Sequence, residues 1–138
     1  MSKLLVLLKF GAAAWNHWRA ENPDRAIVLD RENLDGMVLT GINFSRASLR
    51  GASLHATNLM NADLRQADLT GANLEEADLI SANLEGAVLR QCRLREADFL
   101  GAKVTNAQYE SADLTGALHL PENPVSYTHL TLPTIYSV

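Results

Sequence analysis

The chain has 138 residues, of which 47% are hydrophobic and only 6% aromatic, and its formal net charge is −4. This length suits a single domain, and the scarcity of aromatic side chains indicates a core made mainly of Leu and Ala. A mildly acidic chain lacks the basic stripe that releases counterions from phosphates, so direct nucleic-acid binding is not expected.

The cysteine content and the first residues bear on location. Cys92 is the single cysteine of the chain, which excludes an internal disulfide and is compatible with a reducing compartment. The apolar run at positions 4–8 ends at Lys9, which makes it shorter than the hydrophobic region of a secretory signal and far shorter than a membrane span. We therefore expect a cytoplasmic protein that does not associate with membranes.

Residues 3–20 have the pattern of an amphipathic helix. Apolar or small residues recur every three or four positions, at Leu4, Leu8, Gly11, Trp15 and Trp18. This spacing gives a helix one buried face, and Pro23 ends the helix because the residue before a proline is disfavoured in helical backbone. The paired tryptophans are compatible with a binding site, but a helix that caps the array following it is the interpretation we favour.

From Ala26 onward the sequence repeats every five residues without an insertion. The fourth position of each unit runs from Leu29 to Leu114 through 18 units, and it is Leu in fourteen of them. The other four units carry Phe44, Phe99, Val104 and Tyr109. The second position is Ala in most units, with Thr57 and Cys92 as small replacements.

A period of five fits neither regular helix nor straight strand. Five residues turn an α-helix by about 500°, so successive Leu residues would not share a face, and an odd period reverses the face of a strand. A corner in every unit resolves both conflicts. Seven of the eight glycines occupy one slot, two positions after the central residue, where a type II turn requires positive φ. Asn61 and Asn106 tolerate the same conformation, and the remaining corners are expected to use type I turns.

The units predict short strands joined by tight corners, with Leu and Ala inside and coils stacked about 4.8 Å apart. Units such as NADLR, QADLT, GANLE, EADLI, SANLE, EADFL and SADLT closely resemble the pentapeptide-repeat family, whose motif is A-(D/N)-L-x-x. The resemblance implies an all-β fold, a right-handed four-sided β-helix with one pentapeptide per side. It divides the chain into an N-terminal capping helix and linker (1–25), the β-helix (26–118) and a tail (119–138).

Both ends of the array depart from the pattern. In the first coil the inward slot holds Glu32, Met37 and Ile42 instead of Ala. The segment before the repeats also resembles the leader of some bacterial members of the family. Residues 125–138 resemble the translation of a transposase-type sequencing adapter, so we exclude them from the fold and expect the natural protein to continue differently after Pro124.

The search for chemistry gives no catalytic signature. The chain lacks the motifs of zinc proteases, serine hydrolases, P-loops and dinucleotide binding. His17, His55 and His119 are scattered and do not form a metal-ligand set. Cys92 occupies an inward slot, where it acts as a small apolar side chain. We therefore expect no enzyme activity, no cofactor and no metal site.

What remains is the outer surface. If four units complete one coil, positions twenty apart stack on one side, and Met60, Ile80 and Leu100 follow Thr40 in one such row. Asp78 and Asp98 flank the row, and that side carries no Lys or Arg. A contiguous exposed apolar row is typical of an interaction surface. Chance composition, or cover by a further C-terminal segment, are the competing interpretations.

The sequence therefore favours a non-catalytic protein-protein interaction or scaffold module with an unknown protein partner. Self-association through one side of the β-helix, or through a C-terminal segment, is a further possibility. The resemblance offers an alternative, because some family members mimic DNA and regulate type II topoisomerases. Arg90, Arg93 and Arg95 interrupt the acidity that such mimicry needs. An adaptor domain fused to an effector is the third reading.

Overall fold

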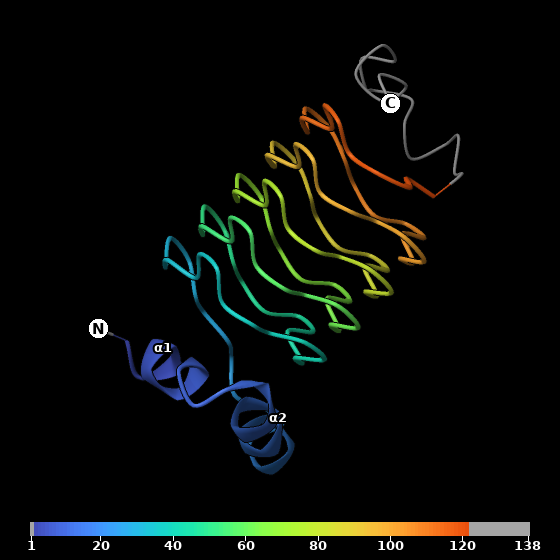
Figure 1. The fold of residues 1–138 in the computed structure, drawn as a ribbon. Helices are drawn as coiled ribbons and strands as arrows, with labels where there is room; N and C mark the ends of the chain where they lie inside the picture. The colour runs from blue at the N-terminus through green and yellow to red at the C-terminus, as the bar shows by residue number, and fades with distance from the viewer. Residues whose placement is uncertain (1, 122–138) are drawn as a thin grey trace.

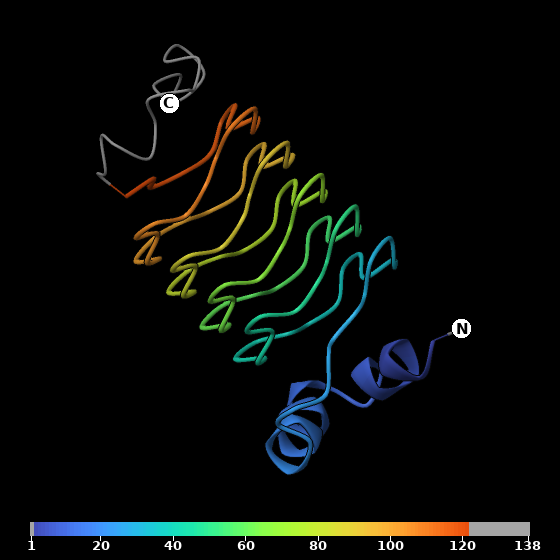
Figure 2. The same cartoon turned by 180° about the vertical axis from the view of Figure 1, so that it is seen from behind.

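The structure is a computed structural model that describes residues 2–121, so the predictions for residues 125–138 lie outside the described part. Two helices at one end are followed by a stack of coils that carries the chain to the opposite end (Figures 1 and 2). The molecule is thus an elongated solenoid whose sides are long, regular surfaces.

The coils repeat every 20 residues. Parallel bridges join residues 20 apart in sequence, from Val28–Ser48 at the start to Asp98–Leu118 at the end. Because each unit has five residues, four units form one turn, as the resemblance to the pentapeptide-repeat family implied. We name the four sides A to D after the first central residue on each, which are Leu29, Leu34, Leu39 and Phe44.

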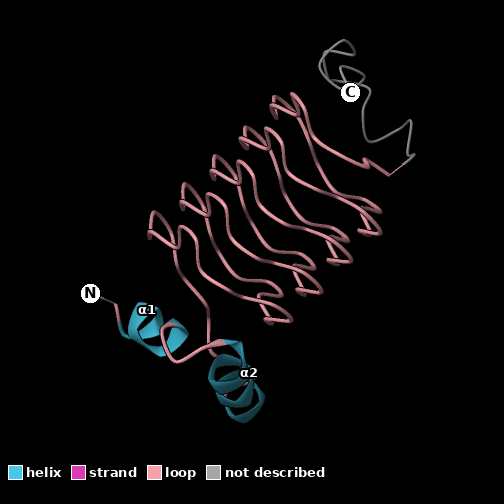
Figure 3. Cartoon of the chain, viewed as in Figure 1, coloured by secondary structure: helices cyan, strands magenta, loops and turns pink. Residues whose placement is uncertain are grey.

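The sides are not extended strands. Each pentapeptide contributes a single bridged residue, and the rest of the unit is turn or irregular backbone (Figure 3). The predicted strands are therefore shorter than expected. A corner follows each side so soon that only one residue per side pairs with the neighbouring coils. At Asp68 the backbone N–H donates to Ala47 O at 2.9 Å, and the next N–H, of Leu69, donates to Val88 O at 2.8 Å. The fold also contains two helices in addition to the β-helix.

The interior confirms the predicted inward positions. The central Leu and Phe residues of the array are fully buried, and almost every Ala of the second slot is buried with them. Thr57 fits the same slot because its hydroxyl donates to the carbonyl of Leu54 at 2.8 Å. In the first coil, Glu32 and Met37 are only partly buried, so the charged side chain in this inward slot keeps contact with solvent.

Every corner has the same backbone conformation. At the position two after the central residue, φ is positive in all 18 units, between 65° and 71° at the glycines and between 57° and 62° elsewhere. Asn61 and Asn106 have positive φ as expected, but the expectation that the corners without Gly or Asn can use type I turns was wrong. The corner N–H must donate along the solenoid axis to the next coil, as Glu76 N does to Arg95 O at 2.9 Å, and this requirement is the same for every residue type.

The N-terminal segment forms two helices where the sequence predicted one. Helix α1 is Lys3–Leu8 and α2 is Ala12–Glu21. Gly11 separates them, with φ of 101°, a value that side chains rarely allow. Leu8 and Trp15 of the predicted stripe are buried. Trp15 packs its ring edge-on against Phe44, with ring centroids 5.5 Å apart.

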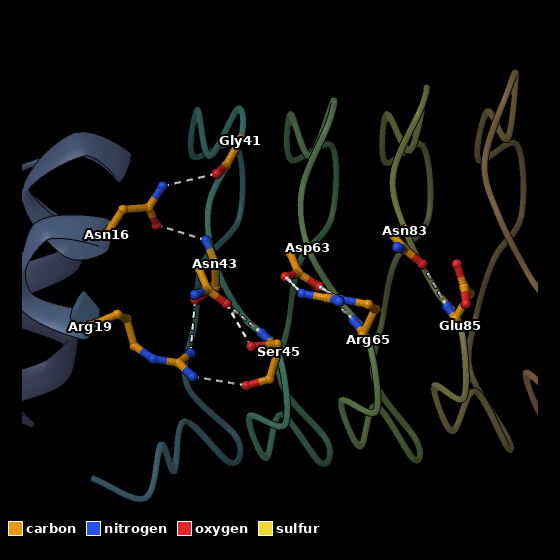
Figure 4. Close-up of polar contacts among 9 residues, drawn as sticks. All are labelled: Asn16, Arg19, Gly41, Asn43, Ser45, Asp63, Arg65, Asn83 and Glu85. Atoms are coloured by element: carbon orange, nitrogen blue, oxygen red, sulfur yellow. Dashed lines mark hydrogen bonds and ion pairs between the residues drawn. The ribbon is translucent and has the colours of Figure 1, made fainter. Parts of the chain in front are cut away.

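Helix α2 contacts the first coil on side D through its polar side chains (Figure 4). The amide of Asn16 accepts from the backbone N–H of Asn43 at 2.7 Å and donates to Gly41 O at 2.9 Å. The guanidinium of Arg19 donates to Asn43 O and Ser45 O at 2.9 and 3.0 Å. These are backbone groups that have no preceding coil to pair with.

Candidate functional site

Side C carries the predicted apolar ridge, which we define as Met60, Ile80 and Leu100. Met60 and Ile80 are half-buried and Leu100 is 49% exposed. The three residues are in register, because the N–H groups of Asn61 and Ser81 donate to the carbonyls of Ile80 and Leu100 at 2.9 and 2.8 Å. The structure therefore brings these side chains together as one row across three coils.

The apolar character of side C extends beyond the ridge. Val38 in the first coil is 69% exposed, and Leu118 at the other end is 38% exposed. Both occupy the slot just before the central residue, next to the ridge rather than within it. The sequence analysis missed them because it followed one slot at a time, whereas an adjoining slot on the same side also faces outward.

Asp78 and Asp98 flank the ridge and also shape its backbone. One carboxylate oxygen of each accepts the N–H of the ridge residue two positions on, Ile80 and Leu100, at 3.0 Å. The same oxygen of Asp98 lies 3.0 Å from Nδ1 of His119. Each aspartate therefore fixes the turn that presents an apolar side chain and leaves negative charge beside that side chain.

The turn-forming role explains the Asp or Asn preference at this slot, which the sequence analysis left without a physical reason. Side chains here accept the N–H two residues later, closing an Asx turn. This contact is made by Asn33, Asn43, Asn58, Asp63, Asp68, Asn73, Asp78, Asn83, Asp98 and Asp113. The recurrence of Asp or Asn every five residues was the signal in the sequence that could have predicted these Asx turns.

On the other three sides, several acidic groups pair with arginine. The pairs are Arg50–Asp68 and Arg90–Glu110 on side A, Arg93–Glu75 and Arg95–Asp113 on side B, and Arg65–Asp63 on side D. Their N–O distances range from 2.7 to 3.5 Å. Among the described residues, no ion pair with Lys or Arg is found for Asp78 or Asp98. Side C therefore combines exposed apolar side chains with two carboxylates that meet no Lys or Arg among the described residues, although His119 lies beside Asp98.

Hydrogen bonding holds several carboxylates of these other sides in the charged form. The guanidinium of Arg65 donates to Asp63 and lowers the pKa of that carboxyl (Figure 4). The hydroxyl and backbone N–H of Thr115 lower the pKa of Asp113 in the same way. Burial raises the pKa of Asp68, but hydrogen bonds from Thr70 outweigh it, so the net shift is downward.

The groups considered for chemistry lie apart and are inert. Cys92 is buried, and desolvation raises its pKa to about 12, so no thiolate forms near neutral pH. The three histidines within residues 2–121 lie beside separate acidic residues, in the pairs His17–Glu21, His55–Glu76 and His119–Asp98. Across the described residues, no three His, Cys, Asp or Glu side chains could hold a metal ion together. No helix within residues 2–121 is long and apolar enough to cross a membrane.

A shallow groove follows the corner between sides D and A. It is lined by Ser45, Arg46, Arg65, Gln66, Glu85, Gly86, Thr105 and Asn106. Its lining is polar and mixed in charge, and it contains neither a nucleophile with a neighbouring base nor an apolar floor. The groove therefore lacks the features of a catalytic site and of an apolar ligand pocket.

Comparison with known protein families identifies the same five-residue repeat that the structure shows. The family model for pentapeptide repeats matches residues 33–66, 57–95 and 72–108 with eight copies, which together span more than half of the chain. The chain belongs to the pentapeptide-repeat family. A search of curated proteins gave no match.

Solved pentapeptide-repeat structures share the fold. A protein from the Arabidopsis thaliana thylakoid lumen is 29% identical, with a TM-score of 0.71 over 80% of this chain and 78% of that one. A protein from Nostoc PCC 7120 is 31% identical, with a TM-score of 0.54 over 82% and 87% of the two chains. Since the first of these resides in a thylakoid lumen, the cytoplasmic location of this pentapeptide-repeat protein stays a prediction.

A third similar structure belongs to a resistance protein. QnrB1, a plasmid-mediated fluoroquinolone resistance protein, is 26% identical, with a TM-score of 0.55. The match covers 70% of this chain but only 49% of QnrB1. This pentapeptide-repeat protein therefore shares the β-helix with QnrB1 over about half of QnrB1's length.

Proposed function

We propose that this protein is a non-catalytic interaction module that binds a protein partner through side C. The observation that supports this most is the row of Met60, Ile80 and Leu100 beside Asp78 and Asp98, held in register by the backbone ladder. An apolar row on a regular scaffold loses water-exposed area when a partner covers it, and the flanking charges select the orientation of that partner.

The test replaces the ridge without touching the core. The triple variant M60S/I80S/L100S should keep the circular dichroism and melting temperature of the wild type, because none of the three side chains is part of the buried Leu stack. It should lose the proteins that the wild type retains from an extract of the source cells. The matched control is R65S/E85S/T105S, which changes the same slot on side D. Equal loss by both variants, or by neither, would rule out side C.

The second candidate is the DNA-mimicking regulator of a type II topoisomerase. The similarity to a fluoroquinolone resistance protein favours it. The arginine pairs on sides A, B and D oppose it, because paired charges project a weaker field than a continuous acidic surface. The test is whether the protein inhibits DNA supercoiling by purified gyrase. If both the wild type and M60S/I80S/L100S inhibit it, this second candidate is supported over the first.

We propose in addition that helices α1 and α2 act as the N-terminal cap of the solenoid. The support is the set of hydrogen bonds from Asn16 and Arg19 to the outer edge of the first coil, together with the burial of Trp15. Uncovered backbone groups at a solenoid end are open to pairing with other chains, and terminal caps prevent this.

A further inference from the structure

Side C also carries information about the kind of partner, an inference that rests on the function proposed above. The ridge has a fixed repeat, since coils stack about 4.8 Å apart, so Met60 to Leu100 spans about 9.6 Å. An α-helix lying along the solenoid axis presents residues i, i+4 and i+7 over about 10.5 Å. An extended strand presents every second residue, and three of them span about 13.4 Å. The ridge therefore matches a helix better than a strand.

The charges of side C specify the polar face of that helix. Asp78 and Asp98 lie two positions before the ridge residues Ile80 and Leu100, on the same side of the coil. Both side chains are only partly buried. Each accepts one backbone N–H, and Asp98 also contacts His119. Elsewhere on the solenoid, arginines from the same chain meet the carboxylates. On side C, His119 of the same chain meets Asp98, but no Lys or Arg within the described residues meets either aspartate, so a Lys or Arg for them would come from the partner.

A second copy of the chain does not fit these charges. Packing side C on side C would bring four aspartates into one interface with no Lys or Arg from that side, and desolvated carboxylates without a cation destabilise an interface. A partner with apolar residues at helical spacing and Lys or Arg beside them satisfies both features.

We propose that side C binds a cationic amphipathic α-helix, aligned with the solenoid axis. Its apolar face packs along Met60, Ile80 and Leu100. Its lysines or arginines reach Asp78 and Asp98, with their aliphatic stems lying over the adjoining apolar surface. Val38 and Leu118 lengthen the apolar contact at the two ends.

The experiment uses the full chain and a labelled 14-residue model peptide of Leu and Lys, with Leu at helical spacing. Fluorescence anisotropy should show the Leu/Lys peptide binding at least about 10-fold more tightly than a Leu/Glu peptide of the same pattern. M60S/I80S/L100S should weaken binding of the Leu/Lys peptide by at least about 10-fold. D78N/D98N should weaken it by about 3- to 10-fold and reduce its salt dependence.

The matched control is D68N/D113N, which removes the same charge from the same slot on sides A and B. Asn occupies this slot naturally at Asn73 and Asn83, so all four substitutions preserve the Asx turn. The control should change binding by less than about 2-fold. Equal weakening by the two charge variants would overturn the proposal, because it would show attraction to overall acidity.

Two other outcomes would also overturn the cationic helix. One is a dimer, seen by light scattering, that the ridge variant dissociates, which would make a second copy the occupant. The other is absence of Leu/Lys binding while the ridge variant still loses a protein retained by the wild type. This second outcome would reject a cationic helix as the partner but would still support protein binding through side C. A failure of the partner proposal can therefore be distinguished from a failure of the proposed function.

Discussion

At the scale of the residue, the corner position decides how much strain the array stores. Eleven of the 18 corners place a non-glycine residue at φ near 60°, a conformation that costs a side chain about 1–2 kcal/mol. Glycine avoids this cost but loses more conformational freedom on folding. The array tolerates both, and in 14 of the 18 corners the N–H donates to a carbonyl of the next coil.

A reciprocal pair of substitutions measures this strain. Gly71→Ala should lower the free energy of unfolding by about 1 kcal/mol, because Ala at positive φ is strained. An added Cβ at Gly71 meets no atom within 4 Å, so no steric clash contributes. Ala56→Gly, at an exposed corner with φ of 57°, should raise the free energy of unfolding by up to about 1 kcal/mol. Urea denaturation checks both, and changes of the same sign would contradict the strain argument.

At the scale of the element, helix α2 substitutes side chains for a missing coil. Within the array, each coil receives N–H and C=O partners from the coil before it. For Asn43 these partners are the side chains of Asn16 and Arg19 (Figure 4). The indole N–H of Trp15 also donates to the carbonyl of Asn43. Arg19 is almost fully buried there, and burial lowers its pKa, while hydrogen bonds to backbone carbonyls compensate its charge.

Removing these partners tests the proposed capping role. N16A/R19A should lower the free energy of unfolding by about 2–4 kcal/mol, because it leaves partly buried backbone groups of the first coil unpaired. Hydrogen exchange at the amide of Asn43 should accelerate in parallel. His17→Ala is the matched control, since its side chain lies on the same helix and is 76% exposed. If N16A/R19A is as stable as His17→Ala, the proposal that helix α2 caps the solenoid is contradicted.

At the scale of the whole molecule, stability comes from contacts between neighbouring coils. Each Leu stacks on the residues of the coils above and below it, and the backbone ladder continues from Val28 to Leu118. Such a solenoid behaves as a one-dimensional array in which a defect in the middle separates two short stacks.

Leu69→Asp places this defect near the middle of the array. Leu69 is fully buried, and an unpaired carboxylate there has neither water nor a partner, so we expect the β-helix to unfold. Leu100→Asp introduces the same charge on the exposed ridge and should change the free energy of unfolding by less than about 0.5 kcal/mol. Circular dichroism and size-exclusion chromatography distinguish the two results. A folded Leu69→Asp variant would mean that the interior is not sealed.

The sequence by itself determined the unit of the fold. The stacked row of Met60, Ile80 and Leu100 depends on four units per coil, which only the resemblance to the pentapeptide-repeat family implied. A period of five with one apolar and one small residue per unit cannot be buried by a helix or a straight strand, so it determines the corner and the inward slots. These features depend on residues close together in sequence, and the repetition makes the pattern unambiguous.

The tertiary structure alone decided the rest, because it depends on residues that are distant in sequence. The corners at Glu76 and Gln66 have positive φ and donate their N–H groups to the next coil, although the preferences of these residues favour other turns. The docking of Arg19 on Asn43 joins segments 24 residues apart, and no local pattern encodes it. The arginine pairs that join neighbouring coils on sides A and B likewise appear only when coils stack, and within the described residues no such pair forms at Asp78.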